Sequence, residues 1–200
     1  MSRIKMFFSC QMHHSAKVIL ILRILQQNPK MEQPLELTSE QQRRIDRFQR
    51  QVKSIGFRFF LLKKLPMAWL AGLRVKHLSM ERCETTIPFK WLNQNPFRST
   101  YFAVLSMAGE FASGLPALMI TRSHPVKVSL LVVDLQATFS KKAMGKVTFV
   151  CDEVPALAKT IQDAVESKEG RTYQATSIGY NTQGEEVARF MVTWSFKSKS

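Results

Sequence analysis

The stretch that decides the fold is STYFAVLSMAGEFASGLPALMIT, Ser99–Thr121, which is apolar over most of its length and carries one charged residue, Glu110. A helix that is apolar on nearly every side has to be covered by the rest of the protein. An antiparallel sheet curled around such a helix is the natural cover in an α+β domain. We therefore expect this stretch to be a long central helix wrapped by a sheet.

The same stretch is long enough to cross a membrane. It also contains Ser106, Ser113 and the run Gly114-Leu115-Pro116, in addition to its acid. Proline and glycine together predict that one helix ends near residue 114 and a short helix restarts after it. We prefer the buried core helix and expect no membrane span.

The segments around the central helix alternate in a way that predicts strands. Residues 74–89 indicate a hairpin, and Phe190, Val192, Trp194 and Phe196 alternate with more polar neighbours in a second hairpin. The segment KVSLLVVDLQATF, residues 127–139, is apolar on both faces at its start, which predicts a central strand. Residues 154–167 indicate an amphipathic helix, with four residues expected to face inward: Ala156, Ile161, Ala164 and Val165.

The N-terminal part differs from the rest. Thr38 followed by Gln41 is a capping-box pattern that predicts a helix over residues 38–54. A second apolar helical stretch follows, in which Pro66 predicts a new first turn and Gly72 a stop. We therefore divide the chain into a poorly ordered extension at 1–30, which we interpret as an upstream addition before Met31, flanking helices at 31–72 and a main domain at 73–198.

The chain of 200 residues has a formal net charge of +14. Such a charge suits nucleic acid, an anionic membrane or a phosphate-bearing ligand. The basic residues are spread out and no nucleic-acid-binding motif is visible, so we expect a generally basic surface and no nucleic-acid partner. Three cysteines without CxxC spacing argue against disulfides and metal sites and favour a reducing compartment, the cytoplasm. We expect neither metal nor cofactor.

Glu110 lies on a stripe of small and hydroxylated residues at helical spacing: Ser99, Ala103, Ser106, Ser113 and Gly114. A buried glutamate needs a hydrogen-bond partner or shifts its pKa upward toward neutrality, where it suits general-base catalysis. Two interpretations stay open. Glu110 accepts hydrogen bonds from a loop or a second subunit and does no chemistry, or it is a catalytic base.

The loop before the helix adds a second group of candidates. Asn95-Pro96 is a turn signal, and Ser99 or Thr100 is suited to cap the helix. Free backbone N–H groups in the first turn, near residues 101–103, can polarise a carbonyl. Asn95 can donate to an oxygen or hold a water. An amide, free N–H groups and a carboxylate together suit acyl transfer.

The stretch TTIPFKWLNQNPFRSTYFAVLSMAGEFASG, residues 85–114, resembles the hotdog-fold family called domain of unknown function 4442, which is similar to PaaI-type acyl-CoA thioesterases. The resemblance covers about residues 57–198. In PaaI-type enzymes an asparagine precedes a His-Gly-Gly by six residues and an acid follows that histidine by nine. Asn95, Tyr101 and Glu110 keep both spacings.

The resemblance implies a curved antiparallel sheet around a central helix and a homodimer or dimer of dimers with the active site between subunits. It implies that Glu110 is base or nucleophile, that Asn95 positions water or the thioester, and that the N–H of Phe102 or Ala103 polarises its carbonyl. The substrate would be an acyl-CoA, whose phosphates would meet basic side chains, the candidates being Lys141, Lys142, Lys146, Arg122 and Lys127.

The chain departs from the enzymes at one point, where Tyr101-Phe102-Ala103 stands in place of His-Gly-Gly. The lost glycines add bulk where the backbone would meet the substrate. Three functions are therefore compared: an acyl-CoA thioesterase, a non-catalytic acyl or acyl-CoA binding protein, and a nucleic-acid-associated protein. We expect the first, with substrate contacts from Ser99, Tyr101, Phe102, Ala103, Ser106 and Ser113 and chemistry from Glu110 and Asn95.

Overall fold

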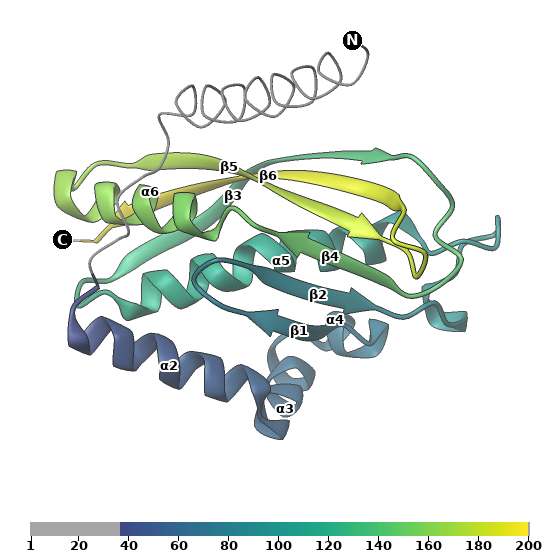
Figure 1. The fold of residues 1–200 in the computed structure, drawn as a ribbon, viewed down its shortest axis with the longest axis horizontal. Coiled ribbons are helices and arrows are strands. Elements are labelled where there is room, and N and C mark those ends of the chain that lie inside the picture. The colour runs from purple at the N-terminus through teal and green to yellow at the C-terminus, as the bar shows by residue number, and fades with distance from the viewer. Residues whose placement is uncertain (1–36, 200) are drawn as a thin grey trace, which may run out of the picture. The chain divides into compact units, whose positions relative to one another are not determined.

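A long helix, α5 (Phe102–Ser123), lies inside a curved sheet, as the computed structural model shows for residues 37–199 (Figure 1). The predicted extension at residues 1–30 lies outside the described residues. The other elements are, in chain order, α2 (Ser39–Lys53), α3 (Ile55–Lys64), α4 (Pro66–Ala71), β1 (Arg74–Leu78), β2 (Cys83–Ile87), the 3-10 turn η1 (Trp91–Asn93), β3 (Val128–Phe139), β4 (Val147–Cys151), α6 (Val154–Ser167), β5 (Arg171–Tyr180) and β6 (Glu186–Ser198).

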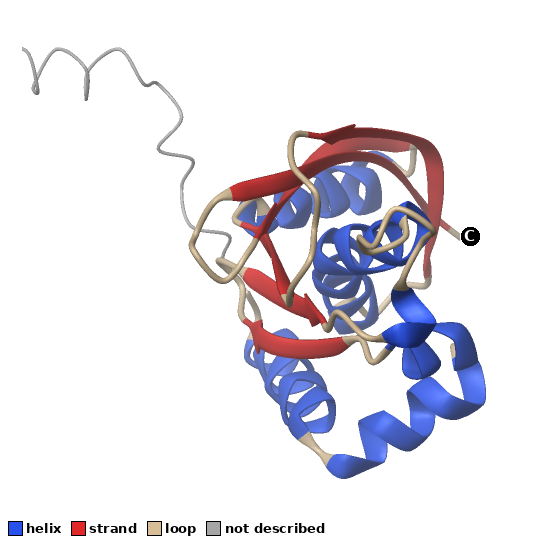
Figure 2. Cartoon of the chain, turned by 90° about the vertical axis from the view of Figure 1, so that its right-hand side faces the viewer, coloured by secondary structure: helices blue, strands red, loops and turns tan. Residues whose placement is uncertain are grey.

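The strands form one six-stranded sheet in the order β1-β2-β4-β5-β6-β3, and every neighbouring pair is antiparallel. The sheet curls around α5 when the molecule is viewed from its end (Figure 2). The expectation of a curved antiparallel sheet around a central helix is confirmed. Among residues 37–199, α5 alone is long and apolar enough to span a membrane, and 67% of its most apolar window is buried in the fold, as in a core helix.

Two glycines set how closely α5 approaches the sheet. A Cβ on Gly109 would lie 2.6 Å from the ring of Phe190 on β6, and one on Gly114 would lie 2.8 Å from the ring of Trp194. Such distances are far inside van der Waals contact, so only glycine fits at either position. The large aromatic side chains of β6 can therefore lie flat against the helix and fill the core.

Helix α5 does not stop at the Gly-Leu-Pro run, which corrects the prediction of a break and a restart. It continues without interruption to Ser123, with Pro116 inside it and buried. Proline removes one backbone hydrogen bond from a helix. Ala117, Met119 and Ile120 follow it and are essentially buried, so burial of their side chains offsets that loss.

Strand β3 lies at the edge of the sheet and pairs only with β6, which corrects the prediction of a central strand. Most of its side chains are exposed in the single chain, Leu131 at 64% and Val133 at 52%. The apolar residues on both faces of this strand predicted that it would be buried, but no other described element packs over its exposed residues. An edge strand of this kind presents free backbone groups on which another strand can pair.

The flanking helices follow the sequence signals closely. Thr38 and Gln41 form the reciprocal capping box of α2, Pro66 begins α4, and Gly72 ends it with φ of 82°. Helix α2 packs on α5, and at its start Gln41 Nε2 lies 3.5 Å from His124 Nδ1. The described flanking helices thus share a core with the sheet and α5 instead of standing apart.

Helix α6 covers the sheet with a face slightly different from the expected one. Its buried residues are Val154, Leu157, Ala158, Ile161 and Ala164. Ala156 and Val165, expected to face inward, are only half-buried. The helix starts at Val154, and the buried residues recur from there at intervals of three or four, as expected for one face of a helix.

Two cysteines face each other across the sheet. Cys83 on β2 is the register partner of Cys151 on β4, and both are buried free thiols. Burial raises the pKa of both thiols, that of Cys151 to about 11. Neither is a reactive thiolate at neutral pH.

We predict that Gly109→Ala destabilises the fold by about 1–2 kcal/mol, because the new methyl group would overpack against Phe190. The same change at Gly56 in α3, where the nearest atom to a new Cβ is 3.4 Å away, should be neutral or stabilising by up to about 1 kcal/mol. Urea unfolding of both variants measures this. Equal stabilisation by the two substitutions would contradict the proposed contact.

Candidate functional site

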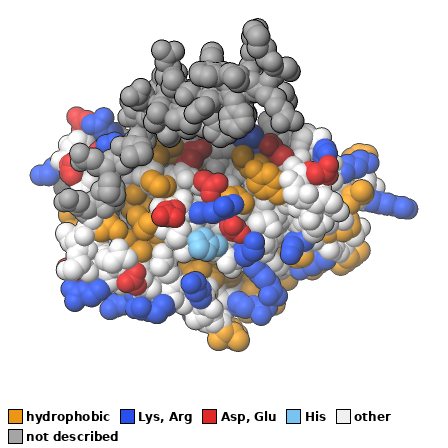
Figure 3. All heavy atoms as spheres, in the orientation of Figure 1, with side chains coloured by type: hydrophobic (Ala, Val, Ile, Leu, Met, Phe, Trp, Pro, Cys, Tyr) orange, Lys and Arg blue, Asp and Glu red, His pale blue; other side chains and the backbone are white. Residues whose placement is uncertain are grey.

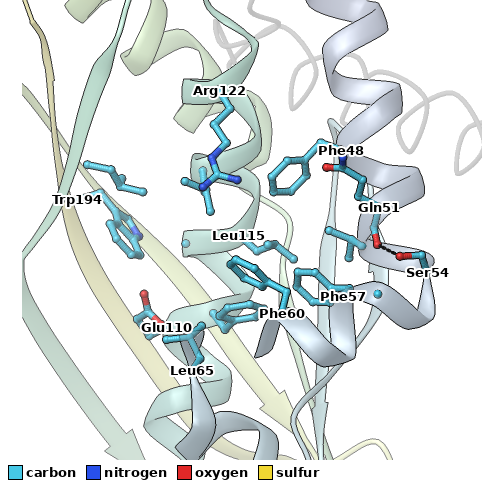
Figure 4. Close-up of a pocket in the computed structure, with 16 residues that line it drawn as sticks. Phe48, Gln51, Ser54, Phe57, Phe60, Leu65, Glu110, Leu115, Arg122 and Trp194 are labelled. Atoms are coloured by element: carbon cyan, nitrogen blue, oxygen red, sulfur yellow. Dashed lines mark hydrogen bonds between the residues drawn. The ribbon is translucent and has the colours of Figure 1, made fainter. Parts of the chain in front are cut away.

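The side chain of Glu110 lines a cavity of about 570 Å³, which lies between α5, the flanking helices and the sheet. Figure 4 shows its carboxylate at one end of the cavity and Arg122 at the other, with Trp194 facing α3 across the space. The two charged groups are twelve helical residues apart, or about 18 Å along α5. The wall between them is mostly apolar and consists of Phe48, Val52, Phe57, Phe60, Leu65, Phe111, Leu115, Leu118, Leu130 and Trp194. Such a lining suits an apolar ligand.

The position of Glu110 depends on the residues one turn further along α5. Gly114 leaves room for the carboxylate, since a Cβ there would lie 2.9 Å from Glu110 Oε1. Ser113 donates to the Glu110 carbonyl oxygen (3.1 Å) and accepts a hydrogen bond from Trp194 Nε1 (3.0 Å). The tryptophan ring is thereby fixed beside the acid. Ser113 therefore serves to hold the cavity wall.

Burial raises the pKa of Glu110 from its ordinary value of 4.5 to about 7. No other cause contributes, because among residues 37–199 no hydrogen bond or ion pair reaches its carboxylate. A carboxyl group in this state is about half ionised at neutral pH. It can therefore take up or release a proton under ordinary conditions.

Asn95 lies outside this cavity, in the loop before α5. Its Oδ1 accepts hydrogen bonds from the N–H groups of Phe97 (3.0 Å) and Ser99 (3.2 Å), and its Nδ2 donates to Ser99 Oγ (3.0 Å). This is an Asx-type turn, in which the side chain braces its own loop. Arg98 in the same loop has φ of 58°, the left-handed conformation.

The helix start differs from the prediction that Ser99 or Thr100 caps it. Tyr101 occupies the N-cap position and makes no side-chain cap. Thr100 instead binds the Ala143 carbonyl oxygen through both its N–H (2.8 Å) and its Oγ1 (2.9 Å), which ties the loop to the β3–β4 connection. The N–H groups of Phe102 and Ala103 consequently have no acceptor among the described residues, as expected for a first turn.

The remaining candidates divide between the two ends of the stripe. Ser113 and Gly114 surround Glu110, whereas Ser106 donates to the Phe102 carbonyl oxygen (2.9 Å) and Ser99 lies in the loop before the helix. The rings of Tyr101 and Phe102 are exposed and contact each other at 4.8 Å between centroids. Glu110 lies eight residues beyond Phe102, or about 12 Å along the helix. Within one chain, the helix start and the acid do not share a cavity.

The sequence did not identify the outer wall of the cavity. Phe48, Phe57 and Phe60 come from α2 and α3, elements expected only to flank the main domain, and Trp194 was predicted solely as a core residue. The available signal was α3 itself, which carries apolar side chains on two opposite faces and so has more than one face to cover. Of the lysines and arginines expected near a phosphate group, Arg122 lines the cavity, while Lys141 is ion-paired with Glu185 at 2.6 Å.

Comparisons with known proteins agree with this architecture. The sequence matches a family described as domain of unknown function (DUF4442) over residues 54–196. A comparison with curated proteins found no match.

Three solved structures illustrate the fold. A protein of unknown function from Pseudomonas aeruginosa, described as a probable thioesterase, is 15% identical, with a TM-score of 0.58 over 84% of this chain and 100% of its own. A protein of unknown function from Chlorobaculum tepidum is 14% identical, with a TM-score of 0.61 over 78% of this chain and 94% of its own. A mutant thioesterase from Pseudomonas aeruginosa is 12% identical, with a TM-score of 0.53 over 73% of this chain and 95% of its own. At such identities the likeness shows the fold, and the expected hotdog fold is confirmed.

We predict that Glu110→Gln makes the protein more stable than the parent at pH 8 but not at pH 4.5. Between pH 4.5 and 7 the folded state keeps a proton that the unfolded state has already released, so the stability of the parent falls as pH rises through this range. The difference between variant and parent should grow by about 3 kcal/mol. Urea unfolding at both pH values measures it.

Glu81→Gln, at an exposed turn, is the matched control for the loss of a carboxylate. A stability difference for Glu110→Gln that is the same at both pH values would contradict the raised pKa of its carboxyl group.

Proposed function

The chain belongs to the DUF4442 family, and from that membership we propose that it is a thioesterase-like hotdog protein that hydrolyses acyl-CoA thioesters with Glu110 as general base. The observation that carries the proposal is the placement of this acid. Among the described residues that line the apolar cavity, Glu110 is the one carboxylate, and its pKa of about 7 lets it accept a proton from water at neutral pH.

The geometry suits the two parts of such a substrate. The apolar acyl group would occupy the cavity along α5, where aromatic and leucine side chains replace water around it. The ionised Glu110 would take a proton from a water molecule that attacks the thioester carbonyl carbon. The resulting oxyanion needs donors at its own position, and the N–H groups of Phe102 and Ala103 have the required chemistry.

Those donors and Glu110 are too far apart to act together within one chain, so we propose a homodimer that joins them. Strand β3 has twelve residues, most of them apolar, and among the described residues β6 is its only neighbouring strand, so a second copy can pair with its outer edge about a twofold axis. In that arrangement Asn95 and the helix start of one copy would serve Glu110 of the other. Contacts from Ser99, Tyr101, Phe102, Ala103 and Ser106 would then come from the first copy, and Ser113 would support the acid.

The phosphate groups of coenzyme A need cations near the cavity mouth. Arg43 and Arg47 on α2 border a hollow that shares Phe48, Gln51 and Arg122 with the cavity. Arginine is well suited to bind phosphate. We propose that these arginines, more than the lysines of the β3–β4 connection, meet the coenzyme. The free thiols of Cys83 and Cys151 fit a cytoplasmic location.

A second function, binding of acyl thioesters without hydrolysis, is favoured by one observation. The exposed rings of Tyr101 and Phe102 stand where the related enzymes have a histidine and a glycine, and they add bulk beside the free N–H groups. A panel of acyl-CoA substrates separates the two functions. Saturable binding with no release of free thiol selects the binding protein.

We predict that Glu110→Gln lowers thioesterase turnover by about 100-fold or more, the usual effect of losing a general base. The parent activity should rise with pH around an apparent pKa near 7, because the base acts in its ionised form. Steady-state kinetics from pH 5.5 to 9 measures both effects. Glu81→Gln is the control and should leave turnover unchanged, and equal turnover in a folded Glu110→Gln protein would exclude the catalytic role.

We also predict that Leu131→Asp combined with Val133→Asp converts a dimer into monomers, because two like charges would meet across the paired edges. Light scattering after size-exclusion chromatography measures the molar mass, and the same variant should lose thioesterase activity although Glu110 is intact. A monomeric parent protein would contradict the shared site.

A further inference from the structure

Helix α3 is apolar on two opposite faces, and among residues 37–199 only the inner face packs against the rest of the fold. Phe57, Phe60 and Leu61 face inward, where the first two line the cavity. Ile55, Phe59 and Leu62 lie on the other side, within about 60° of one another around the helix. Ile55 is 73% exposed and Phe59 65% exposed. The outer face is therefore a separate surface from the cavity wall.

The exposed apolar surface continues beyond α3. In α4, Met67, Trp69 and Leu70 are exposed. Together with the three residues of the outer face, these side chains define what we call the α3–α4 patch. A group of large apolar side chains exposed on two consecutive helices marks a site of interaction, since isolated exposed apolar residues are common but clusters are not.

The charge around the patch has one sign. Residues 47–80 contain eight arginines and lysines and no acid. Arg58 and Lys63 lie on either side of the Ile55–Phe59–Leu62 stripe, about 60–80° away around the helix. Within the described chain, no ion pair involves Arg58, Lys63 or Lys64. Basic side chains also outnumber acidic ones along the lower edge of the molecule, where α2 and α3 lie (Figure 3).

We propose that the α3–α4 patch docks on an anionic lipid surface. Aromatic and leucine side chains flanked by Lys and Arg match the interface of a bilayer, where apolar groups enter the acyl boundary and cations meet anionic headgroups. The attachment is peripheral: α3 has 10 residues and α4 has 6, so neither is long enough to cross a membrane.

A second copy of the chain fits this patch less well. A twofold interface places the same surface against itself, so Arg58 and Lys63 of one copy would face the same cations of the other. With no acid anywhere in residues 47–80, nothing in the patch would compensate for that repulsion. The edge of β3, which lacks this dense positive charge, is the better surface for a dimer.

The proposal goes beyond the proposed function and does not depend on whether Glu110 is catalytic. It places the inner face of α3 over the cavity and its outer face on the lipid, so one helix separates the cavity from the membrane. Long-chain acyl thioesters partition into such a surface, and an enzyme or binding protein held there would meet them at high local concentration.

The test is co-sedimentation of the full chain with vesicles of phosphatidylcholine alone or with 30 mol% phosphatidylglycerol. We expect partition onto the anionic vesicles, much weaker binding to phosphatidylcholine alone, and loss of binding in 0.5 M NaCl. Phe59→Ser combined with Leu62→Ser should weaken partition more than tenfold, since it removes two exposed apolar groups. Arg58→Gln combined with Lys63→Gln should weaken it about tenfold or more.

Matched controls remove the same kinds of groups elsewhere. Val126→Ser with Met144→Ser deletes two exposed apolar side chains, and Lys159→Gln with Lys197→Gln deletes two exposed charges. Both controls should bind within about twofold of the parent. All four variants change exposed residues, and circular dichroism and the unfolding midpoint verify that each is folded.

Three results would overturn the proposal. The first is no partition onto anionic vesicles. The second is partition that the two α3 variants leave unchanged, which would assign binding to another part of the chain. The third is a drop in molar mass for Phe59→Ser with Leu62→Ser while lipid binding persists, which would show that a second copy occupies the patch. Thioesterase assays in the absence of lipid test Glu110 independently, so failure of one proposal is distinguishable from failure of the other.

Discussion

The close approach of α5 to β6 is the contact on which the rest of the structure depends. At Gly109 and Gly114 the helix backbone meets the rings of Phe190 and Trp194 at distances that leave no room for a side chain. With the helix held this tightly, the sheet can curl around it and bury the aromatic side chains of β4 and β6 together, Phe149 against Phe190 at 5.5 Å between ring centroids. Gly179 on β5 likewise lets an aromatic ring lie directly against the backbone, since a Cβ there would lie 2.5 Å from the Phe149 ring.

The same constraint creates the candidate site. Because Gly114 has no side chain, the carboxylate of Glu110 can lie over it and beside Trp194, which Ser113 holds in place. The acid is half-buried and its carboxylate has no partner among the described residues; desolvation raises its pKa to about 7, so the folded protein loses stability as pH rises from 4.5 to 7. Groups of this kind are concentrated at functional sites, where the cost is offset by the reactivity it provides. That concentration supports the choice of Glu110 as the centre of the proposed chemistry.

Two of the apolar surfaces that the described residues expose differ in charge. The edge of β3 offers free backbone groups and apolar side chains, which suits pairing with another copy. The α3–α4 patch lies on helices, in a segment (residues 47–80) that contains basic residues and no acid, which suits an anionic surface. Both lie beside the cavity, since Leu130 of β3 and Phe60 of α3 line it. The apolar cavity would thus be enclosed by a second subunit on one side and by α3 on the other.

The sequence by itself determined the elements, the central helix and the identity of the acid within it. Local signals are sufficient for these features: capping boxes, alternation and glycine stops act within a few residues, as Thr38 with Gln41 and Gly72 show. Predictions failed where a local signal competes with distant packing. Pro116 remains inside α5 because burial outweighs one missing hydrogen bond, and β3 lies at an edge because strand order depends on pairings between residues far apart in the chain. Only the tertiary structure decided that Asn95 braces its own loop and that α2 and α3 wall the cavity of Glu110, since no spacing along the chain encodes which side chains meet across it.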